Sequence, residues 1–273
     1  MQGTGSGDRY QGTGLVIYRV DSVSRVFMRQ GMKRALIAAG LLLSSGMALC
    51  SEGAAWDYSG AKGPENWARL SPEYGACAGS NQSPINLSGF IDARLEPIAF
   101  AYNAGSAEIL NNGHTVQVNA RAGSAIVVDG IEFELKQFHF HVPSENLING
   151  QSFPMEGHLV HADENGHLAV VAVMVTEGDA NKALAKAWAQ LPKQGEKLAL
   201  SSDISPLEIL PENRDYYRFN GSLTTPPCSE GVRWLVMKQP ISASKAQIEQ
   251  FLQVIHHHNN RPVQAVNARP VLE

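Results

Sequence analysis

The sequence predicts a mainly β fold built on one large, mainly antiparallel sheet with peripheral helices. Short runs rich in apolar and β-branched residues recur along the chain after residue 56. Asn-Gly and Asp-Gly pairs stand between many of these runs and indicate turns. Only two segments have the spacing of an amphipathic helix, so the helices are expected to lie around the sheet.

The first 55 residues are expected to lie outside this fold. Residues 1–31 have no core pattern and are interpreted as an upstream extension. Residues 32–55 have the features of a secretory signal peptide, because Lys33 and Arg34 precede an apolar run too short to span a membrane. The sequence thus predicts export to the periplasm or secretion. A lipid anchor on Cys50 is the alternative, disfavoured by the bulky Leu49 before it.

Residues 56–273 are predicted to form a single domain, long enough for a large core. Six of the 22 basic and two of the 26 acidic residues lie in the first 50, so residues 51–273 have 16 basic and 24 acidic residues and a net charge of −8. This charge disfavours nucleic acid and anionic membranes as partners. Cys77 and Cys228 form an even pair in an exported chain and are predicted to be disulfide-bonded.

Strands and helices follow from local patterns. Strands are predicted, in order, over 115–119, 125–128, 131–141, 155–161, 168–175 and 232–238. The pairs Asp129-Gly130 and Asn165-Gly166 lie between apolar runs and predict tight hairpins. One helix is predicted over 181–191 and stops before Pro192. The other is predicted over 245–255, where Ser244 and Gln247 have the spacing of a capping box.

Three histidines have the spacing of metal ligands. His139 and His141 are two residues apart on one predicted strand, so they project from the same face. His158 on a neighbouring strand would complete three corners of a tetrahedron and leave the fourth for water, as in a catalytic zinc site. The alternative from the residues alone is a set of hydrogen-bonded core histidines.

The flanking residues favour the zinc site. The odd positions of this strand read Ile131, Phe133, Leu135, Gln137, His139 and His141. One face is therefore expected to begin apolar and to end as a Gln/His/His strip. Gln137 precedes His139 by two residues, and Glu156 precedes His158 by two, so each can accept the second N–H of a ligand.

Several ordered motifs resemble one family. They are Gly63–Trp67, Gln82–Asn86, Leu110–His114, Gln137–His141, Ser144-Glu145, Glu156–His161, Gly221–Cys228, Trp234 and Asn260–Gln264. From residue 56 to residue 273 the chain resembles an α-class carbonic anhydrase of the bacterial, exported kind. The resemblance implies a ten-stranded, mostly antiparallel twisted sheet. It also implies a zinc enzyme that hydrates carbon dioxide reversibly to bicarbonate and a proton by means of zinc-bound hydroxide.

The resemblance implies roles for the matching residues. The zinc ligands are His139, His141 and His158, with Gln137, Glu156 and the backbone near Asn259 as their acceptors. The catalytic residues are His114 as proton shuttle, and Thr224 and Glu145, which orient the nucleophile. The substrate contacts Val160, Val170, Leu223, Thr224, Thr225 and Trp234. Ordered water lies near Tyr58, Asn112 and Gln117.

Two other functions remain as alternatives. A non-catalytic binding module on this fold is disfavoured, because such relatives lose zinc ligands. A zinc-dependent ester hydrolase is disfavoured because the expected cavity residues include no Arg or Lys to hold an anion. A homodimer is compatible with the sequence. His161 is expected to be a core histidine on the face opposite His158, and His256–His258 to be a solvated helix end.

Overall fold

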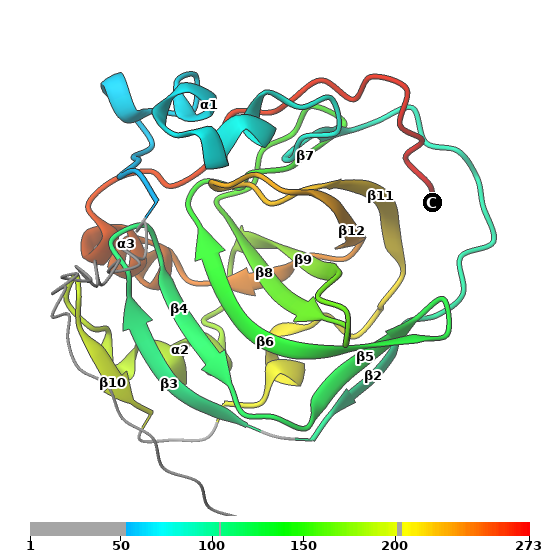
Figure 1. The fold of residues 1–273 in the computed structure, drawn as a ribbon. Coiled ribbons are helices and arrows are strands. Elements are labelled where there is room, and N and C mark those ends of the chain that lie inside the picture. Colours follow the sequence, from blue (N-terminus) through cyan, green and yellow to red (C-terminus); the bar gives the residue numbers. More distant parts are fainter. Residues whose placement is uncertain (1–52, 104, 201–203) are drawn as a thin grey trace, which may run out of the picture. The chain divides into compact units, whose positions relative to one another are not determined.

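The computed structural model describes residues 53–103, 105–200 and 204–273 (Figure 1). The predicted extension, and all but the last three residues of the predicted signal peptide, lie outside the described residues. Within them, no helix is both long and apolar enough to cross a membrane. The described residues form one compact unit.

A central mixed sheet contains eleven strands in the described part of the chain. These strands are β2 (Ala99–Tyr102), β3 (Ser106–Asn111), β4 (Val116–Ala120), β5 (Ser124–Val128), β6 (Ile131–His141), β8 (Met155–Ala162), β9 (Leu168–Glu177), β10 (Lys197–Ala199), β11 (Tyr216–Ser222), β12 (Glu230–Met237) and β13 (Ile241–Ala243). The predicted mainly antiparallel sheet is confirmed. It has eleven strands rather than ten, because short segments such as β10 and β13, of three residues each, also pair with one neighbour.

The main path of the sheet runs β10-β3-β4-β6-β8-β9-β12-β11, and β1 (Asn86–Leu87) pairs separately with β7 (Leu147–Ile148). Among the described strands of the central sheet, only β12 and β13 run parallel to a neighbour, and that neighbour is β9 in both cases. The predicted hairpin at Asp129-Gly130 joins β5 to β6, with φ angles of 55° and 74°. The second predicted hairpin, at Asn165-Gly166, joins β8 to β9.

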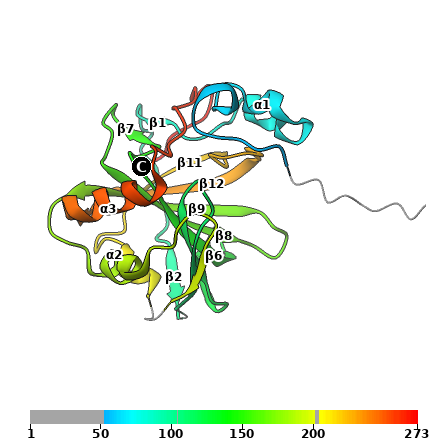
Figure 2. The same cartoon turned by 90° about the vertical axis from the view of Figure 1, so that its left-hand side faces the viewer.

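Two cores pack on this sheet. The helix-side core contains Phe138, Phe140 and Leu159 from the strands and Trp188 and Phe251 from the helical segments. The site-side core contains Val170, Ala172, Met174, Phe219 and Trp234. Figures 1 and 2 show α2 (Lys182–Ala187) and α3 (Lys245–Ile255) together at one side of the sheet.

One prediction about β6 was wrong. The register between β6 and β8 shifts between Leu135 and Gln137, which is the signature of a β-bulge at Lys136. Leu135 pairs with His161, whereas Gln137 pairs with Val160. The extra residue moves the later odd positions to the other face. The Gln/His/His strip therefore continues the face of Glu132 and Glu134, not an apolar face.

The bulge keeps the helix-side core continuous along β6. Phe133 and Leu135 belong to it before the bulge, and Phe138 and Phe140 belong to it afterwards. Gly157, opposite Phe140 on β8, leaves room for this packing. A Cβ at Gly157 would lie 2.8 Å from Phe140 Cε1.

Both predicted helices are present. Asn181 caps α2 by accepting from the backbone N–H groups of residues 183 and 184, and a 3₁₀ turn (Trp188–Gln190) completes the predicted span. Ser244 and Gln247 form the predicted capping box of α3. A short α1 (Trp67–Leu70) and three further 3₁₀ turns (Gly60–Lys62, Pro72–Ala78, Pro206–Ile209) were not predicted.

Candidate metal centre and active site

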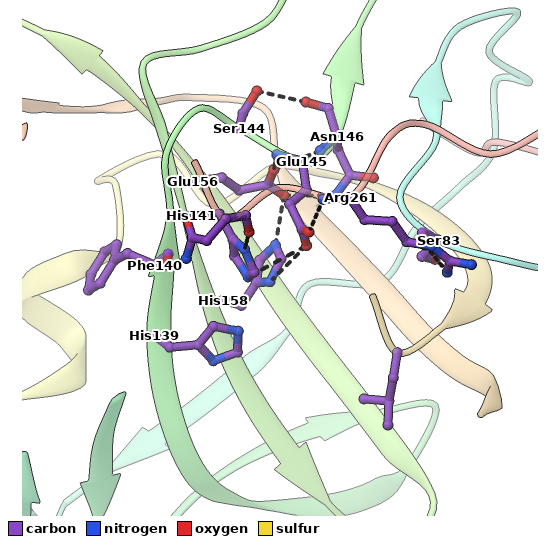
Figure 3. Close-up of polar contacts among 12 residues, drawn as sticks. Ser83, His139, Phe140, His141, Ser144, Glu145, Asn146, Glu156, His158 and Arg261 are labelled. Atoms are coloured by element: carbon purple, nitrogen blue, oxygen red, sulfur yellow. Dashed lines mark hydrogen bonds and ion pairs between the residues drawn. The ribbon is translucent and has the colours of Figure 1, made fainter. Parts of the chain in front are cut away.

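Three imidazoles meet on the site-side face of β6 and β8 (Figure 3). His139 lies directly opposite His158 in the strand register, and His141 follows two residues later on the same face. One ring nitrogen from each histidine lies within 4.8 Å of the other two. The predicted trio is therefore a group able to hold one metal ion.

The second nitrogen of each imidazole has its own acceptor. His139 Nδ1 donates to Gln137 Oε1 over 2.8 Å, and His158 Nε2 donates to Glu156 Oε1 over 2.9 Å. His141 Nδ1 donates to the backbone oxygen of Asn259 over 2.6 Å. Since these oxygens only accept hydrogen bonds, each ring carries its proton there. His139 Nε2, His141 Nε2 and His158 Nδ1 are left with free lone pairs.

Burial and donor chemistry fit a zinc ion. His141 and His158 are buried, and burial lowers the pKa of all three imidazoles, that of His139 and His158 well below the ordinary range. The rings are therefore neutral at physiological pH, as metal ligands must be. His141 Nε2 is buried without a hydrogen-bond partner, a cost that a metal ion would remove. Three imidazole nitrogens are a donor set typical of catalytic zinc.

Two buried carboxylates lie beside the histidines, Glu145 on the loop after β6 and Glu156 on β8. Glu156 Oε2 accepts from the backbone N–H groups of Glu145 and Asn146 over 2.7 and 2.8 Å. Asn146, fully buried, also donates from Nδ2 to Glu156 Oε1 and accepts from the backbone of Ile85. Sequence reasoning missed this linking role of Asn146, because its partners lie on other segments.

Glu145 lies beside two of the free ring nitrogens. Its Oε2 is 3.5 Å from His141 Nε2 and 4.0 Å from His158 Nδ1. Its Oε1 accepts from the backbone N–H of Arg261 over 2.9 Å. Burial raises the pKa of Glu145 well above the ordinary range, and hydrogen bonds from Arg261 and from the Thr224 side chain act in the opposite direction.

An apolar wall adjoins the histidines. Val170 pairs with Val160 on one side and with Trp234 on the other, and Leu223 packs against the same core. The Trp234 ring centroid is 4.9 Å from that of His158. Thr224 is buried just after β11, and Thr225 is half-buried. The structure thus brings together the predicted substrate residues.

The remaining predicted residues occupy the turn before β4 and its surroundings. The His114 ring stacks on Trp56, with centroids 3.7 Å apart, and lies edge-on to Tyr58 at 6.3 Å. Asn112 Oδ1 accepts from the backbone N–H groups of residues 114 and 115, so only its amide N–H groups remain for water. Gln117 pairs with His139 across the strands. Sequence reasoning missed Trp56, which no local pattern marks.

The predicted disulfide between Cys77 and Cys228 is present, and its residues are 151 positions apart. Arg261 forms hydrogen bonds near this disulfide, at Cys77 and at residues 82–83. Its Nη2 donates to the backbone oxygen of Cys77, and its Nη1 donates to Gln82 Oε1 and to the Ser83 backbone. Sequence reasoning also missed these hydrogen bonds of Arg261, because the partners of Arg261 lie 178 to 184 positions away.

Comparison with known proteins decides the family. The family model for eukaryotic-type carbonic anhydrase matches residues 62–273. The chain belongs to the α-carbonic anhydrase family. Carbonic anhydrases hydrate carbon dioxide reversibly to bicarbonate and a proton, and this chain is an enzyme of that family.

Individual carbonic anhydrases are similar in sequence to this chain over most of its length. One from Pectobacterium atrosepticum is 45% identical over 243 residues, 88% of this chain and all of the relative. One from Neisseria gonorrhoeae is 46% identical over 80% of this chain and 87% of the relative. The α-carbonic anhydrase of Thermovibrio ammonificans, solved with sulfanilamide, is 49% identical with a TM-score of 0.80, covering 81% of this chain and all of that one.

Proposed function

We propose that His139, His141 and His158 hold a zinc ion in this carbonic anhydrase. One observation carries the proposal: one ring nitrogen of each histidine lies within 4.8 Å of the other two, and each ring also has a nitrogen that donates to an acceptor. When bound, zinc supplies hydroxide near neutral pH by lowering the pKa of a bound water to about 7, a value known from carbonic anhydrases themselves and adopted from them.

Thr224 and Glu145 orient the nucleophile. In this proposal the Thr224 hydroxyl donates a hydrogen bond to the Glu145 carboxylate, which leaves the hydroxyl oxygen free to accept one hydrogen bond. Glu145 is itself held by the Arg261 backbone and by the bonds of its loop to Glu156. An acceptor fixed in this way directs a lone pair of the nucleophile toward the substrate.

The apolar wall receives carbon dioxide. Carbon dioxide is small and has no net dipole, so a dry surface of Val160, Val170, Leu223 and Trp234 suits it better than water does. Thr225 lies next to the same space and would contact the bound substrate. Trp234 in this wall contacts His158. A substrate bound to the wall therefore lies beside the nucleophile.

His114 carries the released proton to solvent. Its half-buried ring lies against Trp56. We infer that water near Tyr58, Asn112 and Gln117 would connect it with the metal site. Burial lowers the pKa of His114, Asp57 acts to raise it, and His257 acts to lower it. A histidine whose pKa lies below the ordinary value releases its proton readily to buffer near neutral pH.

The enzyme works outside the cytoplasm of a bacterium. The signal-like residues 32–55, the bacterial relatives and the disulfide together support export to the periplasm. No partner other than carbon dioxide and bicarbonate is required by the site.

Carbon dioxide hydration measured by stopped flow, with and without a zinc chelator, tests the proposal. We expect zinc near one equivalent per chain and activity that chelation abolishes. His158→Ala should lose zinc on dialysis, because two imidazoles hold the ion far more weakly than three. His167→Ala is the control, since His167 is exposed and bonds to Asp163. Zinc retained at parity by His158→Ala would refute the ligand assignment.

A further inference from the structure

His257 lies at the His114 turn rather than in solvent. It is half-buried, whereas its neighbours His256 and His258 are exposed, so the predicted solvated helix end is wrong for His257 alone. His256 adopts a left-handed conformation, with φ 63°, at the end of α3, which turns the chain toward residues 113–114. The His257 ring packs against Tyr58 with centroids 5.8 Å apart.

We propose that His257 is a second proton-transfer residue that takes protons from His114 and passes them to solvent. This proposal rests on the proposed role of His114 as the shuttle. It adds a second imidazole to the path by which the proton leaves.

Two contacts hold His257 beside the shuttle. His257 Nε2 lies 3.2 Å from the backbone oxygen of Gly113, the residue before His114. Asn259, two residues after His257, donates from Nδ2 to the backbone oxygen of His114 over 3.0 Å. Both imidazoles also border the Tyr58 ring, at 6.3 and 5.8 Å. Both histidines therefore lie at the turn of residues 113–114, beside Tyr58.

The hydrogen-bond partners of His257 suit a group that carries a proton. Its Nε2 faces the Gly113 oxygen, and its Nδ1 faces the His258 backbone oxygen over 3.1 Å. Both partners are carbonyl oxygens, which only accept. A neutral imidazole has one N–H and can satisfy one of them, whereas an imidazolium satisfies both. Each ring nitrogen of His257 therefore faces an acceptor to which it can donate when it carries a proton.

The proton transfer is a simple exchange. An N–H bond of the His114 imidazolium breaks, the proton crosses intervening water, and an N–H bond forms on neutral His257. His114 becomes neutral and can accept the next proton, while His257 releases its proton to buffer from its exposed Nδ1 side. Among the described residues, Asp57 acts on His114 and Tyr58 borders both rings, while the exposed His256 and His258 flank His257 in the chain. Repulsion between two charged rings keeps one proton in transit at a time.

The substitution His257→Gln distinguishes proton transfer by His257 from a structural role of its hydrogen bond to Gly113. A glutamine amide can still donate to the Gly113 oxygen but cannot carry a proton, and His256→Gln is a matched control at an exposed position of the same helix end. In weak buffer, His257→Gln should lower kcat several-fold, less than the roughly 100-fold cost of losing a sole proton carrier, and leave kcat/KM unchanged. Imidazole buffer should restore kcat.

A second measurement does not depend on activity. In an NMR titration, the His114 pKa should rise in His257→Gln, because the repulsion from a charged His257 is gone. His256→Gln should leave it unchanged.

Three outcomes would overturn the proposal. The first is wild-type kcat in His257→Gln. The second is a kcat loss in His257→Ala that glutamine repairs, since this indicates support of the Gly113 turn. The third is a loss in kcat/KM. His114→Ala tests the shuttle separately: if it leaves kcat unchanged while His257→Gln lowers it, the role of His114 fails and that of His257 stands.

Discussion

At the scale of single residues, the three candidate ligands differ in what holds them. An amide oxygen holds His139, a backbone oxygen holds His141, and a buried carboxylate holds His158. Glu156 also accepts two backbone N–H groups from the loop that carries Glu145. It therefore positions both a ligand and the carboxylate beside the nucleophile, whereas Gln137 is bonded to a ligand alone.

Glu156→Ala should weaken zinc binding roughly 10–100-fold, as the loss of an acceptor behind a metal ligand does. Gln137→Ala should cost less, because it removes one neutral hydrogen bond worth about 1 kcal/mol. Competition with a chelator measures both affinities. Equal losses in the two variants would contradict the larger role of Glu156.

Thr224→Ala should keep zinc but lower kcat/KM on the order of 100-fold, because an orienting hydrogen bond in a dry site contributes a few kcal/mol. Thr224→Ser keeps the hydroxyl and serves as the control. Glu145→Gln should resemble Thr224→Ala, since an amide can donate to the hydroxyl and reverse the hydrogen bond. An unchanged kcat/KM in Thr224→Ala would remove Thr224 from the mechanism.

At the scale of elements, the two faces of β8 carry histidines with different surroundings. His158 faces the candidate metal centre, and His161 faces the helix-side core. His161 Nδ1 donates to the Ala169 oxygen, and its Nε2 accepts from the Tyr102 hydroxyl over 2.7 Å. These partners require a neutral ring, and burial lowers the pKa of His161 to about 4.

His161 should make the fold sensitive to acid. Between about pH 6.5 and pH 4 the unfolded chain binds a proton that the folded chain excludes, so stability falls as the pH falls, by up to about 3 kcal/mol. Urea unfolding of wild type and His161→Gln at pH 7 and pH 4 measures this effect. The variant should lose less stability by about that amount. The same pH dependence in both proteins would contradict the assignment.

At the scale of the whole molecule, the disulfide and Arg261 join distant segments around the catalytic loop. Gln82 Nε2 donates to the Cys228 backbone oxygen, while Gln82 Oε1 accepts from Arg261. Cys228 comes four residues after Thr224 in the chain. The disulfide and the hydrogen bonds of Arg261 therefore support the loop that carries Thr224.

Replacing both Cys77 and Cys228 by Ser should lower the free energy of unfolding by 2–5 kcal/mol, with about 5 kcal/mol as the chain-entropy value for a loop this long. Denaturant unfolding measures the change. Oxidised wild-type protein should show no free thiol from this pair under denaturing conditions. Two free thiols, or unchanged stability in the double variant, would contradict the prediction.

The sequence by itself determined what depends on neighbours in the chain. Strand β6, the Asp129-Gly130 turn, the Ser244 capping box and the spacing of His139 and His141 follow from periods of two to four residues, so local reading found them. The motif resemblance added the family and a list of expected site residues.

Tertiary structure alone decided the rest. The bulge at Lys136 sets which face carries the histidines, and it arises because β6 must keep its phenylalanines in one core. The Asn259 oxygen that holds His141 lies 118 residues away, and the Gly113 oxygen beside His257 lies 144 residues away. Such contacts form when distant segments are packed together by burial of apolar surface, and no local pattern encodes which atoms then meet.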